Sequence, residues 1–268
     1  MSAASDARDK NSTILAVSNL TKRFGGLVAL TDVTFSTITH RVTSVVGPNG
    51  AGKTTLFNLI SGVTRPDGGK VVFDGVDVSG WQPHRLASAG LARTFQNVQL
   101  FPNLNALENV MVGRVCRTSS SVLATLLMLP GERRERRARA ERAEEMLELV
   151  GIADKRLSFP KELPYGDQKR LEIARALATE PKLLILDEPT QGMVAREANS
   201  IVELMSNLTA RRITILLIEH NMNVVMAASD KVIVLNFGQK IAEGAPAEVR
   251  ADPQVIEAYL GAEAWPHC

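Results

Sequence analysis

The sequence is poor in cysteine, in aromatic residues and in net charge. Its 268 residues include two cysteines, Cys116 and Cys268, and neither has a CxxC partner or a nearby histidine at a metal-binding spacing. Aromatic residues make up 4%, and 31 basic against 29 acidic residues leave a net charge of +2. These absences argue against a disulfide framework, a base-stacking surface and a nucleic-acid partner. A reducing cytosol is the simplest setting.

Long hydrophobic runs are also missing. The most apolar stretch, residues 122–129, is far shorter than the roughly 20 residues needed to span a bilayer. Residues 1–12 are polar, lack the apolar centre of a signal peptide and are expected to form a disordered tail. Hydrophobic residues still make up 45% of the chain, enough for a substantial core. Any role at a membrane is therefore expected to come through a partner protein.

Short, β-branched apolar runs alternate with helical patterns along the chain. Such runs are typical of strands buried on both faces of a sheet. Helical patterns at residues 168–178 and 195–208 lie between some of them, which predicts an α/β fold with a largely parallel core. The predicted strands are residues 43–46, 70–73, 183–186, 213–218 and 231–235.

The first part of the chain departs from this alternation. Residues 13–46 and 70–78 are rich in β-forming residues, with turn signals at Gly25-Gly26 and Asp74-Gly75. This pattern predicts an antiparallel sheet packed beside the parallel core.

Residues 98–178 depart in the other direction, because they contain no convincing strand and are expected to be helical. Within them, residues 133–150 indicate an amphipathic helix whose charged side is a solvated face rather than a binding patch. No internal repeat is visible, which argues against two fused copies of one domain. The apolar stripe of the predicted helix consists of Ala143, Met146, Leu147 and Val150.

The clearest motif is a phosphate-binding loop of the Walker A pattern GxxxxGK[ST]. It follows the predicted strand that ends at Val46 and precedes a helical sequence pattern at residues 55–60. We expect successive backbone N–H groups to face one anion, Lys53 to reach the β- and γ-phosphates, Thr54 to coordinate Mg²⁺ and Thr55 to contact the α-phosphate. A glycine turn that carries a lysine by chance is the alternative. The motif consists of Gly47, Pro48, Asn49, Gly50, Ala51, Gly52, Lys53 and Thr54.

Two adjacent acids, Asp187 and Glu188, follow the predicted strand at residues 183–186. Open α/β sheets place their ligand crevice at the carboxyl ends of strands. We expect Asp187 to hold Mg²⁺, directly or through water, and Glu188 to polarise the attacking water as general base. A loop start or a helix N-cap is the alternative for such a pair, and the phosphate-binding loop weakens that alternative.

Two further polar residues are candidates for the same site. His220 follows the predicted strand at residues 213–218, where a neutral imidazole would hydrogen-bond the γ-phosphate or the water. Gln96 has a side-chain carbonyl suited to Mg²⁺ or to the attacking water. Taken alone, the histidine is more often structural and the glutamine is an ordinary loop residue.

In this order, residues 47–54, Gln96, residues 163–168, Asp187-Glu188 and His220 resemble the motif series of the ABC ATPases. The resemblance covers about residues 14–260 and implies ATP and Mg²⁺ as cofactors. It also implies a P-loop NTPase (RecA-like) core with an antiparallel β subdomain and an inserted α-helical subdomain.

The resemblance implies a domain organisation and several roles. An ABC ATPase domain would cover residues 13–250, with its helical subdomain at about residues 98–178. Gln96 would link the γ-phosphate site to a transmembrane partner, and His220 would be the switch histidine. Phe24 would stack on adenine.

The resemblance further implies that a signature motif closes over the ATP of a second subunit in a head-to-tail dimer. The motif follows Leu163 and consists of Pro164, Tyr165, Gly166, Asp167 and Gln168. The family usually has LSGGQ here, so Pro164 replaces a serine whose hydroxyl bonds the γ-phosphate, a loss of about 1.5–3 kcal/mol if uncompensated. We expect weaker closure that relies on the backbone N–H groups around Gly166. Val194 departs too, where the family usually has Asp or Asn.

Finer resemblance points to the LivG-type ATP-binding subunits of branched-chain amino acid importers. It rests on Tyr165-Gly166-x-Gln168, an insertion at about residues 113–140, residues 219–222 and residues 255–261, within a C-terminal extension at 251–268. Urea-uptake ATPases share many of these sequence features and remain an alternative assignment. The branch implies a peripheral protein at the cytoplasmic face of the cell membrane. Its implied partners are transmembrane permease subunits, an identical or related second ATPase subunit and, indirectly, a solute-binding protein.

Two other functional classes are disfavoured. A soluble ABC ATPase that acts on nucleic acid or ribosomes usually carries two cassettes or a long coiled-coil insertion with a basic surface, whereas this chain is nearly neutral. A regulatory module that binds nucleotide without hydrolysis does not need the full set of Lys53, Asp187, Glu188 and His220.

Overall fold

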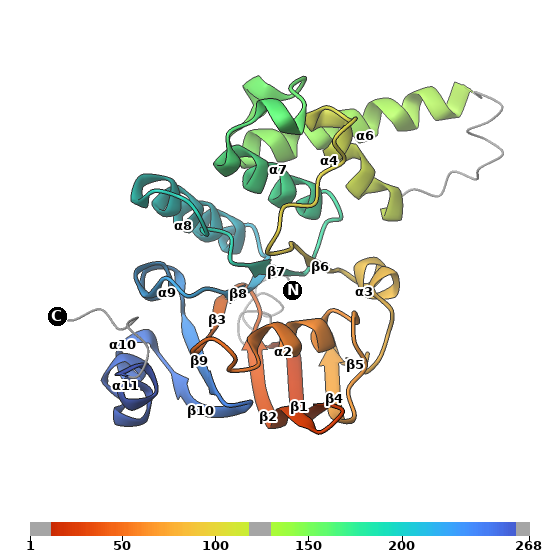
Figure 1. Cartoon of the computed structure of the whole chain (residues 1–268). Coiled ribbons are helices and arrows are strands. Elements are labelled where there is room, and N and C mark those ends of the chain that lie inside the picture. The colour runs from red at the N-terminus through yellow and green to blue at the C-terminus, as the bar shows by residue number, and fades with distance from the viewer. Residues whose placement is uncertain (1–11, 118–129, 261–268) are drawn as a thin grey trace, which may run out of the picture.

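The computed structural model describes residues 12–117 and 130–260, which form two sheets with helices around them (Figure 1). The tail predicted at residues 1–12 lies outside the described residues except for Ser12, and so do the apolar stretch 122–129 and the last residues of the predicted C-terminal extension. Over the described ranges, no helix combines the length and the hydrophobicity that a membrane crossing requires.

The first sheet is antiparallel, with the strand order β2-β1-β4-β5. Turns at Gly25-Gly26 and Asp74-Gly75 join its strands, since Phe24 pairs with Leu27 and Phe73 with Val76. The antiparallel sheet predicted for this part of the chain is thereby confirmed. Its strands are β1 (Thr13–Phe24), β2 (Leu27–Ile38), β4 (Gly68–Phe73) and β5 (Val76–Asp77).

The second sheet has the strand order β10-β9-β3-β8-β7-β6 and is parallel except for the pair β9 and β10. The four apolar runs predicted as its strands are confirmed, but β6 and β10 were not predicted. Neither shows an apolar run, because β6 has only 3 residues and β10 has no fully buried residue. The strands are β3 (Val42–Val46), β6 (Leu91–Arg93), β7 (Leu183–Asp187), β8 (Thr214–Ile218), β9 (Lys231–Asn236) and β10 (Gln239–Gly244).

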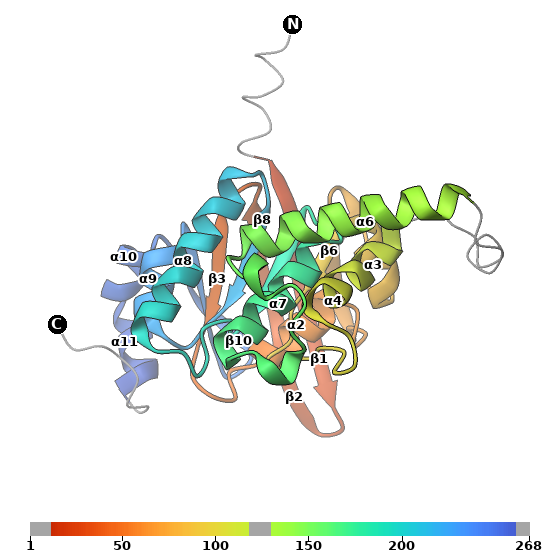
Figure 2. The ribbon, with the colours of Figure 1, turned by 90° about the horizontal axis from the view of Figure 1, so that it is seen from above.

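Helices connect the strands and form a separate group between β6 and β7. In this group, which we call the helical subdomain, α6 contacts α4 and α7 (Figure 2). The structure describes no strand within it. Its elements are α4 (Ala106–Gly113), η1 (Arg114–Arg117), α6 (Pro130–Leu149), η2 (Ala153–Lys155), η3 (Pro160–Glu162) and α7 (Tyr165–Leu177). The other helices are α2 (Lys53–Ile60), α3 (Pro83–Ala89), α8 (Ala195–Ala210), α9 (Met222–Ala228), α10 (Pro246–Ala251) and α11 (Pro253–Leu260).

The apolar stripe predicted for residues 133–150 is buried in the helical subdomain. Ala143 and Leu147 are 0% exposed, and Met146 packs against the same cluster. In the middle of α6, exposed Arg137 and Glu141 form an ion pair four residues apart. The charged side of the helix thus faces solvent, as the sequence pattern predicts.

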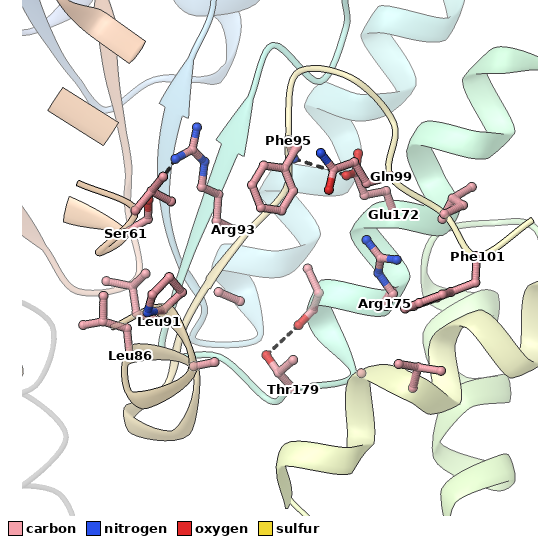
Figure 3. Close-up of a pocket in the computed structure, with 18 residues that line it drawn as sticks. Ser61, Leu86, Leu91, Arg93, Phe95, Gln99, Phe101, Glu172, Arg175 and Thr179 are labelled. Atoms are coloured by element: carbon pink, nitrogen blue, oxygen red, sulfur yellow. Dashed lines mark hydrogen bonds between the residues drawn. The ribbon is translucent and has the colours of Figure 1, made fainter. Parts of the chain in front are cut away.

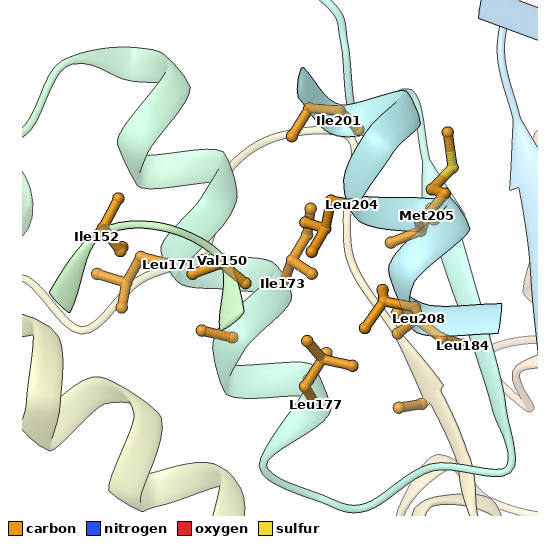
Figure 4. Close-up of a cluster of buried hydrophobic side chains, with 14 of the residues drawn as sticks. Val150, Ile152, Leu171, Ile173, Leu177, Leu184, Ile201, Leu204, Met205 and Leu208 are labelled. Atoms are coloured by element: carbon orange, nitrogen blue, oxygen red, sulfur yellow. The ribbon is translucent and has the colours of Figure 1, made fainter. Parts of the chain in front are cut away.

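Apolar side chains cover both faces of the parallel sheet, because successive residues of a strand point to opposite faces. In β7, Leu184 and Leu186 pack into a cluster with α7 and α8 (Figure 4). Leu183 and Ile185 pack on the other side, in a cluster with residues of α2 and the antiparallel sheet. This two-sided burial explains why the strands are continuous apolar runs.

Candidate functional site

The phosphate-binding loop joins the end of β3 to the start of α2 and is shaped by two glycines. Gly47 has φ 154°, and a Cβ there would lie 2.2 Å from the carbonyl oxygen of Leu235. Gly52 is the N-cap of α2 with φ 99°, and a Cβ there would lie 2.8 Å from the carbonyl oxygen of Ala29. Both positions therefore need glycine for conformation and for space.

Lys53, the first residue of α2, is buried within this loop and only 9% exposed. Its Nζ donates to the carbonyl oxygens of Gly47 and Pro48, at 2.6 and 2.9 Å. Burial lowers the pKa of Lys53, and the carboxylate of Glu188 opposes that shift. The ammonium is thus held at the loop, where phosphate oxygens would compete with two neutral carbonyls for it. Thr54 and Thr55 follow in the first turn of α2.

Asp187, the last residue of β7, forms a buried ion pair that the sequence did not reveal. Its Oδ2 accepts from Arg93 of β6 at 2.8 Å, and the two side chains are 6% and 8% exposed. The other end of the guanidinium donates to Asn58 and Ser61, at 2.7 and 2.8 Å. Arg93 therefore joins β6, β7 and the end of α2. Its position three residues before Gln96 is the only signal of this role in the sequence.

Glu188 follows β7 in a left-handed backbone conformation, with φ 47°. Such a conformation is uncommon for a residue with a side chain, and strain of this kind concentrates at functional sites. The Glu188 N–H donates to the carbonyl oxygen of Ile218 at 3.0 Å, which holds the turn against the end of β8. Its side chain is 15% exposed, so the carboxylate is partly shielded from water.

Three of the predicted residues meet at this carboxylate. Gln96 Nε2 donates to Glu188 Oε2 at 3.3 Å, and His220 Nδ1 lies 3.6 Å from the same oxygen. Gln96 is exposed and the His220 side chain is 56% exposed, so both face the open side of the sheet edge. The structure thus brings together residues that lie up to 124 positions apart in the chain (220 − 96).

Glu219 is a second residue that sequence reasoning missed. It is 0% exposed, and its carboxylate accepts from Thr190 N at 3.0 Å, Thr190 Oγ1 at 2.6 Å, His220 N at 3.1 Å and Asn221 N at 3.3 Å. A buried carboxylate with this many donors ties together the backbones that carry it and its partners. Glu219 therefore joins the loop after β7 to the loop after β8. An acid directly after a mostly apolar strand is the signal that could have found it.

The oxygen donors at this edge fit a Mg²⁺ ion. Mg²⁺ binds hard oxygen ligands, and in nucleotide sites it takes only one or two from protein side chains. The ion pair with Arg93 occupies Asp187 Oδ2 and leaves Oδ1 as a possible ligand. The Thr54 hydroxyl is exposed in the first turn of α2, and the Gln96 side chain is exposed as well. Thr54, Asp187 and Gln96 therefore have the right donor chemistry.

Phe24 lies at the turn end of the β1–β2 hairpin and is 50% exposed. It pairs with Leu27, and Ala29, two residues further along β2, approaches Gly52. The Lys22 Nζ lies 5.4 Å from the centre of the Phe24 ring. The hairpin thus presents an exposed aromatic face on the side of the phosphate-binding loop.

The signature residues lie on a different element, at the start of α7. Pro164 is the N-cap, and its side chain has no hydrogen-bonding group to cap the helix. Its carbonyl accepts from the N–H groups of Asp167 and Gln168, both at 3.0 Å. The Asp167 carboxylate pairs with Lys155 at 2.5 Å. Tyr165 is 43% exposed and lies beside Gly192. These side chains do not join the cluster around Glu188.

Val194 is the N-cap of α8 and is 65% exposed. Its N–H donates to Glu197 Oε2 at 3.3 Å. An apolar side chain at this position offers no hydrogen bond to a facing molecule.

Two family models match the chain. The model described as ABC transporter matches residues 30–191, and the model described as branched-chain amino acid ATP-binding cassette transporter matches residues 239–264. The first spans the region from the phosphate-binding loop to the loop after Glu188. The second covers β10, α10 and α11.

Similar proteins carry related names. The chain is 43% identical to the high-affinity branched-chain amino acid transport ATP-binding protein BraF of Pseudomonas aeruginosa, over 92% of this chain and 98% of the relative. It is 39% identical to the corresponding protein LivG of Escherichia coli K12, with the same coverage of 92% and 98%.

Solved structures share the fold. The ADP conformation of an ATP-binding cassette of an ABC transporter matches with a TM-score of 0.81 and 35% identity, over 93% of this chain and 99% of that one. A dimeric bacterial ABC transporter cassette matches with a TM-score of 0.74 and 26% identity, over 87% and 98%.

Proposed function

The chain belongs to the ABC transporter family, and from this premise we propose that it hydrolyses ATP to power an importer of branched-chain amino acids. The observation that carries the proposal is the convergence of catalytic groups at one sheet edge. There Lys53 lies in the phosphate-binding loop, and Gln96 and His220 both lie within 3.6 Å of Glu188. The solute rests on the names of the relatives and on the match at residues 239–264.

The first step is the binding of the triphosphate. The backbone N–H groups of residues 50–55 and the positive end of α2 would hold the phosphates. Lys53 would exchange its two carbonyl acceptors for β- and γ-phosphate oxygens, and burial strengthens that charge interaction. Phe24 would stack on the adenine. Mg²⁺, held by Thr54 and Asp187 with Gln96 at the γ-phosphate side, would neutralise charge on the phosphates.

The second step is the activation of water. Glu188 is the general base of the proposal, because it is an acid at a strand end that faces the open sheet edge. Gln96 and His220 would orient the water between them and hold the Glu188 side chain toward it. Glu219 would keep the backbone of His220 and that of Thr190 in a constant relation, so that base and switch histidine stay aligned.

The proposed partner at the nucleotide is a second ATPase subunit, identical or related. A cassette with 26% identity to this chain forms a dimer. The α7 N-terminus, with Gly166 in its first turn, would face the ATP of that subunit and offer N–H groups to the γ-phosphate. Because Pro164 offers no hydroxyl, closure would rest on these backbone groups.

The proposed partners in the membrane are permease subunits, which would hold the chain at the cytoplasmic face. A cavity of about 710 Å³ lies between β6, α3, α4 and α7 (Figure 3). It adjoins the loop that carries Gln96, between β6 and α4, which we call the Gln96 loop. Its walls are largely apolar, with Phe95 and Phe101 among them, and Phe101 is 45% exposed. At the wall, the side chain of Glu172 is buried. A permease segment with apolar side chains would fit this cavity.

The primary test is ATP hydrolysis by the purified chain with Mg²⁺, alone and with its permease subunits in proteoliposomes. We expect phosphate release from the parent protein. The Lys53→Ala variant should lose nucleotide affinity, because the charged contact with the phosphates is gone. Lys161→Met, at an exposed lysine of η3, is the matched control and should behave like the parent. No binding and no turnover even with the permease present would refute the proposal.

Transport of the solute is tested separately in the same proteoliposomes. With a solute-binding protein supplied, ATP should drive uptake of labelled leucine, isoleucine and valine. Uptake of urea instead would retain the ATPase assignment and overturn the amino-acid assignment.

The Pro164 departure is tested by restoring the serine. ATP-driven dimerisation of Pro164→Ser, measured by sedimentation, should be tighter than that of the parent by about 10-fold or more, the value of one hydrogen bond to a charged group. Equal dimerisation of both proteins would show that the backbone N–H groups alone suffice.

A further inference from the structure

Two charged side chains of α7 are buried although they lie outside the signature and the catalytic cluster. Lys169 and Glu172 are each only 2% exposed. Burial of a charge is costly unless it is paired and hydrogen-bonded. The apolar side of α7 already packs in the core through Leu171, Ile173 and Leu177 (Figure 4). Attachment of the helix alone therefore does not account for the two charges.

Both side chains bind the main chain of the loop that carries Gln96. Lys169 Nζ donates to the carbonyl oxygen of Gln96 at 2.6 Å and to that of Phe95 at 3.3 Å. Glu172 Oε1 accepts from the Phe95 N–H at 3.2 Å (Figure 3). The Lys169 ammonium binds two carbonyl groups of the loop, and the Glu172 carboxylate binds one of its N–H groups. Both acceptors and a donor of the loop backbone are therefore hydrogen-bonded to α7.

The same loop residue reaches the catalytic base. Gln96 is held by Lys169 through its carbonyl, while its side chain donates to Glu188 at 3.3 Å. Lys169 also lies close enough to interact with the charges of Asp187, Glu188 and Glu219. Lys169 is three residues beyond Gly166 in the same helix, which is about 4.5 Å along the axis. Through Lys169, the signature and the loop that carries Gln96 are therefore joined across less than one helical turn.

We infer that Lys169 and Glu172 are positioning residues that couple the signature helix to the catalytic glutamine. A shift of the α7 N-terminus against a second subunit's ATP displaces both side chains and, with them, the backbone of Phe95 and Gln96. The distance between Gln96 and Glu188 then changes with signature contact. This inference rests on the proposed function, because it requires the signature to contact the ATP of a second subunit.

The test uses variants that remove the hydrogen bonds and variants that keep them. Lys169→Met keeps the apolar stem and loses the donors, and Glu172→Met loses the acceptor for Phe95. Lys169→Arg and Glu172→Gln are the conservative counterparts, and Lys161→Met is the control at an exposed lysine of the same subdomain. We expect kcat for ATP to fall about 10- to 100-fold in the two Met variants, with KM changed less than about 2-fold. The conservative variants should recover most of the rate.

A double-mutant cycle separates coupling from a general structural role. If Lys169 acts through Gln96, Lys169→Met should lower kcat by less than about 2-fold in a Gln96→Ala background. An equal fold-loss in both backgrounds overturns the inference, and so does an unchanged kcat in Lys169→Met. If Lys169→Met does not fold, the same cycle with Glu172→Gln and Glu172→Met decides.

A readout without turnover distinguishes this inference from the proposed function. Amide hydrogen exchange of the segment 93–99 in the full-length chain should rise in Lys169→Met and Glu172→Met and not in Lys161→Met. Unchanged exchange overturns the inference even if the parent hydrolyses ATP. A parent that neither binds nor cleaves ATP refutes the proposed function, while raised exchange would still show that α7 holds the loop.

Discussion

At the edge of the parallel sheet, Asp187 ends β7, Glu188 and His220 lie just beyond β7 and β8, and Lys53 lies at the end of the loop that follows β3. Residues 163–168, by contrast, lie at the start of a helix that continues from no strand. The strand ends share one frame, since Asp187 of β7 and Val45 of β3 both pair with Ile218 of β8. The signature has no such frame and reaches the site through side chains of α7. Backbone hydrogen bonds between strands therefore position the residues at the sheet edge. Side-chain contacts position the signature, which a partner subunit would use.

The sharpest way to test the sheet edge is Glu188→Gln, which keeps the shape of the side chain and removes the base. We expect kcat to fall about 100- to 10,000-fold, because general base catalysis typically contributes that much. Nucleotide affinity should be retained, since Lys53 and the loop amides are unchanged. Phosphate release and equilibrium binding of a fluorescent ATP analogue measure the two effects. Glu203→Gln, at an exposed acid of α8, is the control, and turnover of Glu188→Gln near the parent rate would contradict the role.

The frame itself can be broken at the ion pair between Arg93 and Asp187. Arg93→Ala leaves a buried carboxylate without its cation, which we expect to lower the free energy of unfolding by about 3–5 kcal/mol. Urea unfolding monitored by circular dichroism measures the loss. In the double variant with Asp187→Asn, the cost should be well below the sum of the two single costs. Strict additivity would show that the two side chains act independently.

The helical subdomain can be weakened without touching the sheet edge. Leu147→Ala removes a side chain that is 0% exposed, and we expect a loss of about 2–5 kcal/mol in unfolding free energy. ATP affinity of the folded protein should stay the same, because the phosphate-binding loop is not altered. Leu157→Ala, at a leucine that is 66% exposed, should change stability by less than about 0.5 kcal/mol. A parallel loss of ATP affinity in Leu147→Ala would contradict the separation of the two regions.

A pH series tests the buried contact between the regions. Burial raises the pKa of Glu172, although Lys169 and Arg175 nearby oppose the shift. The native protein therefore keeps this proton to higher pH than the unfolded chain, and stability is lost as pH rises from the ordinary glutamate pKa through the raised one. Glu172→Gln cannot lose a proton. Across this pH window, the unfolding free energy of Glu172→Gln should therefore rise relative to that of the parent. Unfolding measurements from about pH 4 to pH 8 test this. A pH-independent gap would contradict the shift.

The smallest effect is expected at an exposed link between the two sheets. Asp74, in the turn after β4, pairs with Lys182, next to β7, at 2.5 Å, and the side chains are 52% and 57% exposed. Asp74→Asn should cost less than about 1 kcal/mol, because exposed ion pairs contribute little. Thermal unfolding at low and at high salt checks this, since the difference should vanish when salt screens the pair. A larger, salt-independent loss would point to a structural role of the turn.

Much of the fold was predictable because its signals are local. The apolar runs of β3, β7, β8 and β9 and the turns of the antiparallel sheet are legible in short windows of sequence. β6 and β10 were missed because a short strand and an edge strand need no apolar run. Gln96, Glu188 and His220 were singled out as site residues, and the structure places them together. Their roles in ATP hydrolysis stay predictions.

The residues that sequence reasoning missed share one property. Arg93, Lys169 and Glu219 act through contacts with residues 29–94 positions away, namely Asp187 (187 − 93), Gln96 (169 − 96) and Thr190 (219 − 190). The neighbouring residues in the sequence do not distinguish a buried arginine or lysine from one at the surface. Burial and pairing are properties of the packed chain, and only the packed chain reveals them.

By itself, the sequence determined the phosphate-binding loop, the acids at the strand ends and the covered sheet, since strand, glycine turn and helix follow from short-range preferences and from alternation. Only the tertiary structure decided which charges are buried against one another and how α7 is attached to the Gln96 loop. The physical reason is that desolvation and hydrogen-bond geometry depend on which distant segments pack together. The identity of a single residue does not specify that packing.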